Sequence, residues 1–169
     1  MGKITPPTPI TAKHTFENFD CGVESLNEWI RKYALKNETT GASRTFVVCQ
    51  GDEGIGYYAL ATGSIAHQQA PGKIKRKMPD PIPVMLLGRL AVDRSRQSSG
   101  IGRGLLKDAL LRTLAVSAQV GIRALLVHAL SHEAKAFYLH HGFLESPIDP
   151  FALVLALKDA QKYYLETVE

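Results

Sequence analysis

Apolar positions recur along the chain in two spacings, and each spacing predicts one kind of element. Intervals of three and four residues mark one face of a helix, and they predict helices over 22–36, 100–118 and 132–141. Short apolar runs bounded by glycine, proline or polar residues are typical of buried strands. Such runs occur at 44–50, 55–62, 84–92, 124–129 and 151–157, and Phe143-Leu144 begins a further one.

The polar connections complete this picture. We expect an irregular lead-in over 1–13, a loop over 67–83 and a polar helix after 157. Asp20 is expected to cap the first helix, and Gly142 is expected to end the helix over 132–141. Strands and helices in this order predict a mixed α/β fold, in which a central sheet carries helices on both faces. The length of 169 residues suits a single domain over 1–169.

Composition narrows the class of protein. Hydrophobic residues make up 45% and charged residues 21% of the chain, as in ordinary globular proteins. No apolar run approaches the ~20 residues that span a bilayer, and the first residues lack the apolar stretch of a signal peptide. We therefore expect a cytoplasmic protein. Cys21 and Cys49 are too few for a disulfide framework or a four-cysteine zinc site.

The charge is unevenly distributed. The chain carries +4 in all, yet the segment from Lys73 to Arg112 has ten Lys and Arg against three Asp, which is +7 and leaves −3 elsewhere. Such a segment favours contact with an anion such as phosphate or nucleic acid. A solvated basic loop followed by an ordinary helix surface explains the charge equally well.

A glycine-rich stretch lies inside this basic segment. A predicted strand ends at Val92, and Gln97-Ser98-Ser99-Gly100-Ile101-Gly102 then opens a long helix. Glycines allow close backbone approach, and the unpaired amides of a first helical turn attract anions. The third glycine, Gly104, is misplaced for a dinucleotide fingerprint, and the Gly-Lys-Ser/Thr of a nucleotide-binding P-loop is absent. A glycine-rich helix start without a ligand is the alternative.

The pattern Gln-x-x-Gly-x-Gly resembles the pyrophosphate loop of the GCN5-related N-acetyltransferases, the GNAT family, which holds the diphosphate of coenzyme A. A second element strengthens the resemblance, because residues 134–143 match the GNAT pattern Ala-x-x-Phe-Tyr-x-x-x-Gly-Phe. The resemblance covers roughly residues 40–157. It implies the GNAT fold, a mixed twisted sheet with a splayed strand pair that admits acetyl-CoA.

The resemblance also implies an acetyl-CoA site. Leu90, Ala91 and Val92 would offer backbone groups to the pantetheine arm, and Tyr138 would donate a proton to the leaving thiolate. A core tyrosine with its hydroxyl at the rim is the alternative for Tyr138. The other residues implied in acetyl-CoA binding are Arg96, Gln97, Ser98, Ser99, Gly100, Ile101, Gly102, Arg103, Gly104, Ser131, Ala134 and Phe137.

Several further stretches resemble the GNAT toxins of bacterial type II toxin–antitoxin modules. These stretches are 42–49, 58–64, 78–84 and 89–93. Such toxins acetylate the α-amine of the amino acid carried by charged tRNA and so block translation. The resemblance implies a homodimer that is neutralised by a ribbon-helix-helix antitoxin encoded next to it. It also implies that the protein reaches DNA, and represses its own transcription, only through the antitoxin complex.

The predicted strand 84–92 contains no acid that could serve as a base. This absence favours an amine that is already partly neutral, and a free α-amine has a pKa of ~8 against ~10.4 for lysine. An ester should lower the pKa further, so an aminoacyl-tRNA fits better than a lysine does. Phosphate contacts give affinity without sequence readout, and we expect them from Lys75, Arg76, Lys77, Arg89 and Arg94.

Two other functions stay open. An ordinary GNAT enzyme that acts on a small amine or a protein N-terminus would not need the +7 segment. A non-catalytic nucleic-acid-binding module on the same fold would not need the glycine loop and Tyr138. We expect no metal centre, because His128 lies on a predicted strand while His132, His140 and His141 straddle a predicted helix.

Overall fold

The computed structural model describes the backbone of residues 2–166 and the side chains of residues 2–162. Its strands are β1 (Thr8–Pro9), β2 (Arg44–Gln50), β3 (Glu53–Ile65), β4 (Ile82–Val92), β5 (Ala124–His128), β6 (Leu144–Glu145) and β7 (Ala152–Ala156). Its helices are α1 (Glu24–Lys32), α2 (Ala34–Thr40), α3 (Gly72–Lys75), α4 (Ile101–Ser117), α5 (His132–His140) and α6 (Leu157–Glu166), with the 3-10 turns η1 (His67–Gln69) and η2 (Arg94–Arg96).

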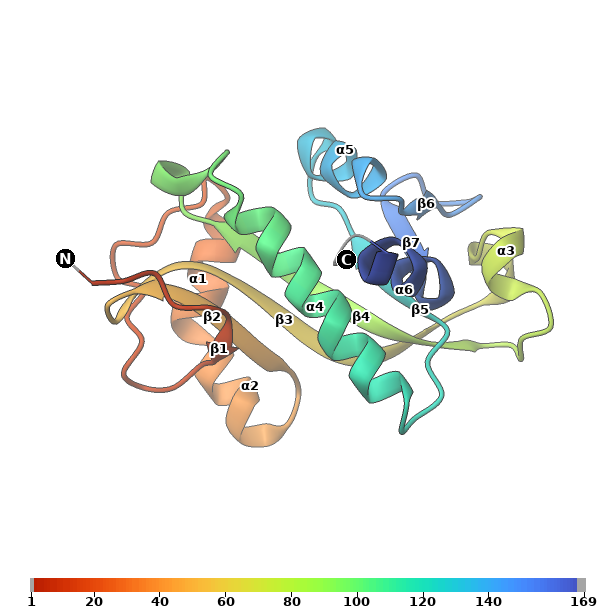
Figure 1. Ribbon diagram of the computed structural model, residues 1–169, viewed down its shortest axis with the longest axis horizontal. Helices are drawn as coiled ribbons and strands as arrows, with labels where there is room; N and C mark the ends of the chain where they lie inside the picture. The colour runs from red at the N-terminus through yellow and green to blue at the C-terminus, as the bar shows by residue number, and fades with distance from the viewer. Residues whose placement is uncertain (1, 167–169) are drawn as a thin grey trace. The chain divides into compact units, whose positions relative to one another are not determined.

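Hydrogen bonds join the strands in the order β1-β2-β3-β4-β5-β7-β6 (Figure 1). The chain divides into two compact units, one made of Met1–Ala61 and Gly88–Ala109 and the other of Thr62–Leu87 and Leu110–Glu169. The long elements β3, β4 and α4 contribute to both units. Within residues 2–166, none of the helices has the length and apolar character needed to span a bilayer.

The first unit is built around the antiparallel hairpin of β2 and β3. Arg44 pairs with Leu60 and Gln50 with Glu53, so β2 has its predicted bounds and β3 is longer than predicted. Thr8 of β1 pairs with Val47 on the outer side of β2. The lead-in over 1–13 thus contains a short strand that the sequence did not predict, because backbone pairing at a sheet edge requires no apolar pattern.

Two adjacent buried tyrosines show how helices cover both faces of this hairpin. Tyr57 stacks on Trp29 of α1, with ring centroids 5.9 Å apart, while the Tyr58 hydroxyl donates a hydrogen bond to Asp108 of α4. Successive side chains on a strand point to opposite faces, so α1 and the first half of α4 lie on opposite sides. A Cβ on Gly56 would lie 3.2 Å from the side chains of Ile101 and Leu105, so glycine permits the close packing of α4.

The second unit contains the parallel pair β4–β5 and the antiparallel strands β7 and β6. Val84 pairs with Ala124 and Leu87 with Val127. Val154 of β7 packs in a cluster with Ile74 of α3, whereas a Cβ on Gly142, just after α5, would contact Leu155 at 3.8 Å. Helices therefore cover both faces here too, and the predicted mixed α/β fold with a helix-covered sheet is confirmed.

Three local predictions need correction. Asp20 does not cap α1, because the N-cap residue is Val23 and its side chain makes no capping hydrogen bond. The loop over 67–83 contains η1 and α3, a short helix whose Ile74 is fully buried. The helix over 22–36 is split into α1 and α2. The predicted polar helix after 157 is α6, and residues 167–169 lie outside the described residues.

Candidate functional site

The loop between β4 and α4 has an unusual backbone. The φ angles of Ser98 and Gly100 are 68° and 90°, in the left-handed region that glycine adopts without strain. Left-handed residues next to right-handed ones turn backbone amides toward a common concavity, which attracts anions. Gly104 donates the first helical hydrogen bond, to the Gly100 carbonyl at 3.0 Å. The amides of 101–103 therefore precede the hydrogen-bonded ladder of α4, as in anion-binding helix starts.

The side chain of Gln97 holds this loop against the end of β4. Its amide nitrogen donates to the carbonyl oxygens of Val92, at 3.0 Å, and Cys21, at 3.1 Å. Residues 97–100 are all exposed, and within the loop the amide and the hydroxyl of Ser99 both donate to the Arg96 carbonyl. The side chain of Gln97 therefore supports the loop, and its nitrogen is already hydrogen-bonded to the two carbonyls. Gln97 would contribute to a ligand site through its backbone.

The two arginines that flank the loop differ in their surroundings. The Arg96 guanidinium donates to the side-chain oxygen of Gln50 on β2, which fixes it beside the loop. Arg103 is exposed on the first turn of α4. Both therefore carry positive charge at the start of the helix, where an anion would bind.

The end of β4 has a backbone edge that β5 does not cover. Among the described residues, pairing of β4 with β5 ends at Leu87, yet β4 continues to Val92. The Ala91 carbonyl lies 3.4 Å from the position of a Cβ on Gly56 of β3, so it points toward β3. By alternation, Leu90 and Val92 present their carbonyls to the other edge. Gln97 takes the Val92 carbonyl, which leaves Leu90 as the residue best placed to pair with a ligand.

Tyr138 lies in the second unit, on α5. The hydroxyl of Ser131 caps this helix by accepting from the Ala134 amide at 3.0 Å. The Tyr138 side chain is 5% exposed, and its ring meets the edges of Phe137 and Phe143 at 5.2 and 5.3 Å between centroids. Burial raises the pKa of Tyr138, so its hydroxyl carries a proton at neutral pH.

A basic cavity of about 350 Å³ also lies in the second unit. Arg123 shapes it by donating to the carbonyls of Ile74, at 3.0 Å, and Lys73, at 3.2 Å. Lys73 pairs with Asp159 at 2.7 Å, while the left-handed φ of 61° at Lys77 turns the chain after α3. Among the residues with described side chains, the cavity is lined by no acid; its lining is Lys73, Arg76, Lys77, Met78, Arg123, Ala156 and Lys158.

The residues expected to contact tRNA do not all belong to this cavity. Lys75 is exposed on α3 but is not among the lining residues. Arg89 and Arg94 belong to the first unit, where Arg94 lies 3.6 Å from the Asp20 carboxylate. Arg123 and Lys158 were missed by the sequence interpretation because both lie outside the basic segment 73–112. Arg123 and Lys158 line the cavity together with 73–78 because α3 packs near β7.

In the described part of the chain, no three His, Cys, Asp or Glu side chains gather where they could hold a metal ion. His132 packs edge-on against Phe151, and His140 against His141. These histidine rings thus make aromatic contacts.

Sequence comparison identifies relatives along nearly the whole chain. The family described as Acetyltransferase (GNAT) domain matches residues 41–145. The tRNA-acetylating toxin of Mycobacterium tuberculosis is 48% identical over 161 residues, which cover 95% of this chain and 97% of that protein.

Solved structures of similar fold include toxins of the same kind. AtaT complexed with acetyl-methionyl-tRNAfMet matches with a TM-score of 0.88 and 29% identity, covering 96% of this chain and 99% of that one. A mutant AtaT toxin bound to the C-terminus of the antitoxin AtaR and acetyl-CoA matches with a TM-score of 0.82 and 28% identity, covering 95% of this chain and 98% of that one.

Proposed function

Because the chain belongs to the GNAT family of acetyltransferases, we propose that it moves the acetyl group of acetyl-CoA to the α-amine of the amino acid on charged tRNA. The observation that carries the proposal is the similarity, over nearly the whole chain, to a tRNA-acetylating toxin. An acetylated amine is no longer a nucleophile for peptide-bond formation, so the product would stop translation.

The first unit supports the acetyl-CoA part of the proposal. The exposed loop at Ser98 and Gly100 and the amides of 101–103 fit a diphosphate. The free edge of β4 at Leu90 fits the amides of a pantetheine arm, which can pair as an added strand. Bound there, acetyl-CoA supplies the activated acetyl group, and the chain binds and orients it.

The chemistry requires a neutral amine and a proton for the departing sulfur. The nitrogen bonds to the carbonyl carbon, the carbon–sulfur bond breaks, and the nitrogen releases its proton to water, from which the donor that protonates the sulfur is then reprotonated. β4 carries no acidic residue, so the amine would arrive neutral, which suits an α-amine with a pKa of ~8. Tyr138, kept protonated by burial, would donate the proton to sulfur.

The basic cavity supports a tRNA substrate. Arg76 and Lys77 line it together with Arg123 and Lys158, and a cavity lined by cations suits the phosphodiester backbone. Lys75, Arg89 and Arg94 would add contacts outside the cavity. An enzyme for small amines would have no use for this concentration of charge.

The proposal includes the regulation that the toxin resemblance implies. The protein would act in the cytoplasm, where charged tRNA is found, and would form a homodimer. A ribbon-helix-helix antitoxin encoded beside it would neutralise it, and DNA would be reached only through their complex. A structural neighbour bound to the C-terminus of an antitoxin supports such a partner.

The proposal is tested by transfer of radiolabelled acetyl groups with the purified protein. Charged tRNA, uncharged tRNA, free amino acids and peptides with a free N-terminus are offered in parallel. We expect label in charged tRNA alone. Efficient labelling of peptides or free amino acids with none in charged tRNA would contradict the proposal and favour an ordinary acetyltransferase.

A further inference from the structure

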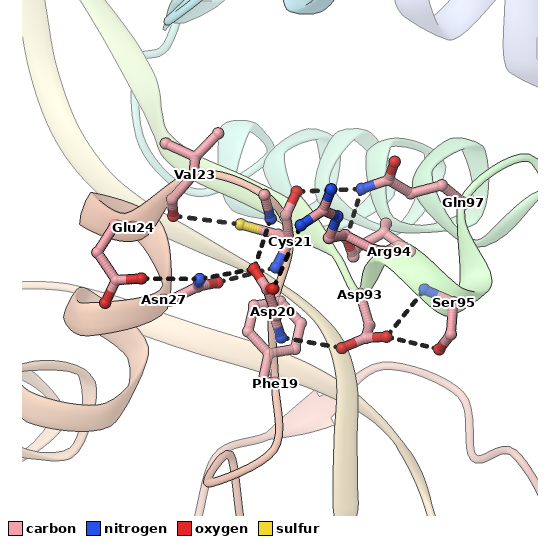
Figure 2. A network of polar contacts seen from close by, with 12 residues as sticks. Phe19, Asp20, Cys21, Val23, Glu24, Asn27, Asp93, Arg94, Ser95 and Gln97 are labelled. Carbon is pink, nitrogen blue, oxygen red and sulfur yellow. Dashed lines mark hydrogen bonds and ion pairs between the residues drawn. The ribbon is translucent and has the colours of Figure 1, made fainter.

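We infer that the segment Asp20–Asn27 positions the diphosphate loop, so that the buried Asn27 sets the affinity for acetyl-CoA without contacting it. The inference rests on the proposed assignment of the loop to acetyl-CoA. The network of polar contacts in Figure 2 carries it, and every residue of that network belongs to the first unit.

The segment binds the chain just before the loop at three points. The Asp20 carbonyl accepts from the Arg94 amide at 2.8 Å, and the Asp20 amide donates to the Asp93 carboxylate at 2.9 Å. The Cys21 carbonyl accepts from the side chain of Gln97 at 3.1 Å. These contacts join residues more than seventy positions apart in sequence, so the course of the chain from Asp93 to Gln97 depends on the course of 20–21.

Asn27 in turn fixes the course of 20–21. Its side chain is 2% exposed, and its oxygen accepts from the Cys21 amide at 2.9 Å. Its nitrogen donates to the Asp20 carboxylate at 3.0 Å. The same carboxylate oxygen accepts from the Gly22 amide at 2.9 Å, and the φ of 91° at Gly22 closes the turn. The donor and the acceptor of Asn27 are thus both used, and α1 holds the amide in place.

Charge strengthens both anchors. The hydrogen bonds from the Gly22 amide and from Asn27 hold the pKa of Asp20 below its usual range. The pKa of Asp93 is also lowered: partial burial raises it, but the hydrogen bonds from Ser95 and the Asp20 amide outweigh burial. Both carboxylates are therefore ionised at neutral pH, and hydrogen bonds to ionised acceptors are roughly twice as strong as neutral ones.

The diphosphate loop begins where this network ends. Ser98 follows Gln97 directly, Gly100 lies two residues further on, and both are exposed. Backbone amides bind an anion well only when they converge on it, and such convergence fails when the supporting contacts are lost. Displacement of Gln97 should therefore weaken acetyl-CoA binding. The acyl-transfer step should be spared, because Tyr138 belongs to the other unit.

The variant Asn27→Asp distinguishes a positioning role of Asn27 from a purely structural one. The new carboxylate keeps one oxygen to accept from the Cys21 amide, but its second oxygen faces the carboxylates of Asp20 and Glu24, to which Asn27 now donates at 3.0 and 3.4 Å. Two carboxylates in one site repel each other until one takes up a proton. The affinity of Asn27→Asp for acetyl-CoA should therefore be poor at pH 8 and recover at pH 5.5. Loss of packing alone would show no such recovery.

The test is calorimetric titration of the full chain with acetyl-CoA at pH 8 and pH 5.5. For Asn27→Asp we expect a Kd raised about tenfold or more at pH 8, near wild type at pH 5.5, with kcat at saturating acetyl-CoA within about threefold. Asn37→Asp, half-buried on α2, is the matched control and should bind normally. A normal Kd of Asn27→Asp at pH 8, or an equal loss at both pH values, overturns the inference.

A second variant guards against a folding defect. Gln97→Leu removes the hydrogen bonds from the loop to the Cys21 and Val92 carbonyls and lies at an exposed position, so the fold should tolerate it. We expect it to raise the Kd for acetyl-CoA at pH 8 and at pH 5.5 alike, as much as Asn27→Asp raises it at pH 8, and a normal Kd in Gln97→Leu counts against the inference. Gly102→Glu separates the two claims. If that change leaves binding intact, the loop assignment itself is wrong; if it abolishes binding while Asn27→Asp binds normally, only the positioning role is wrong.

Discussion

The guanidinium carbon of Arg89 lies 4.3 Å from the centroid of the Trp29 ring. Arg89 comes from β4 and Trp29 from α1, and the indole also stacks on Tyr57 of β3. A half-buried cation over an aromatic face is stabilised by the ring quadrupole. This contact joins the strand that should carry the acyl donor to the helix that positions its loop.

Arg89 should therefore contribute to stability by its shape and to tRNA binding by its charge. Arg89→Lys keeps the charge but loses the planar stack, and should lower the free energy of unfolding by ~0.5–1 kcal/mol. Arg89→Gln also loses the charge, and should flatten the salt dependence of tRNA binding by ~0.9 in logarithmic slope. Thermal melts and filter-binding titrations measure the two effects. Equal slopes for both variants would mean that Arg89 touches no phosphate.

Gly102→Glu should abolish acetyl-CoA binding while the fold remains intact. The change puts a side chain and a negative charge among the amides of 101–103, where the diphosphate would sit. Calorimetry measures the binding, and circular dichroism checks the fold. Gly121→Glu is a control, because a Cβ at Gly121 meets nothing within 4 Å. Unchanged affinity in Gly102→Glu would remove the acetyl-CoA assignment.

The basic cavity predicts unequal effects for neighbouring cations. Arg76→Gln and Lys158→Gln, both in its lining, should each weaken tRNA binding more than Lys75→Gln, which lies outside it. Neutralising Lys75, Arg76 and Lys77 together should reduce the salt slope by ~2–3, with acetyl-CoA affinity unchanged. Lys36→Gln on α2 serves as an exposed control. If the triple variant bound tRNA with normal affinity, the basic segment 75–77 would be only a solvated surface.

Tyr138→Phe keeps the ring and most of its packing. If the hydroxyl protonates the leaving thiolate, turnover should fall by ~10²–10⁴, while acetyl-CoA binding and the melting temperature stay near wild type. Single-turnover acetylation of charged tRNA measures the loss. A stable variant with near-normal transfer would make Tyr138 a core residue and leave the site without a proton donor.

The pH dependence gives an independent check on Tyr138. Burial raises its pKa above the ordinary value of 10.0, so its proton is present throughout the neutral range. Activity should rise with pH as the α-amine of the substrate becomes neutral, with no fall from Tyr138 below about pH 10. A raised pKa in the folded state also means that the stability contributed by the neutral phenol is complete below pH 10 and is lost at higher pH. A descending limb near pH 8 that disappears in Tyr138→Phe would contradict this account.

The local pattern of residue types was enough to predict much of this fold. The run from Arg44 to Gln50 was predicted with its bounds because β-branched and aromatic residues precede a clear turn signal at 51–54. Gly142 was predicted to end α5, and its φ of 93° fits that position. The glycine loop was found because its spacing is a motif, and the left-handed angles at Ser98 and Gly100 give the motif its geometry.

The features that the sequence pattern did not predict depend on contacts between residues that are distant in sequence. Asp20 looked like a helix cap, because an acid before a helix commonly is one, yet its partners include Arg94 and the turn at Gly22. Arg123 and Lys158 join the cavity only through the packing of α3. Asn27 gave no signal at all, since a polar residue inside an amphipathic helix is ordinary until the partners of its amide are known.

The most direct test of the proposed activity is the chemical identity of the product. Charged tRNA is incubated with the protein and acetyl-CoA and is then digested with nuclease. The mass of the terminal aminoacyl-adenosine is measured by mass spectrometry. We expect a mass gain of one acetyl group on the α-amine of the amino acid, and we expect this gain to be absent with Tyr138→Phe on the same time scale. An unmodified aminoacyl-adenosine, or an acetyl group found on the nucleoside or on a lysine side chain, would contradict it.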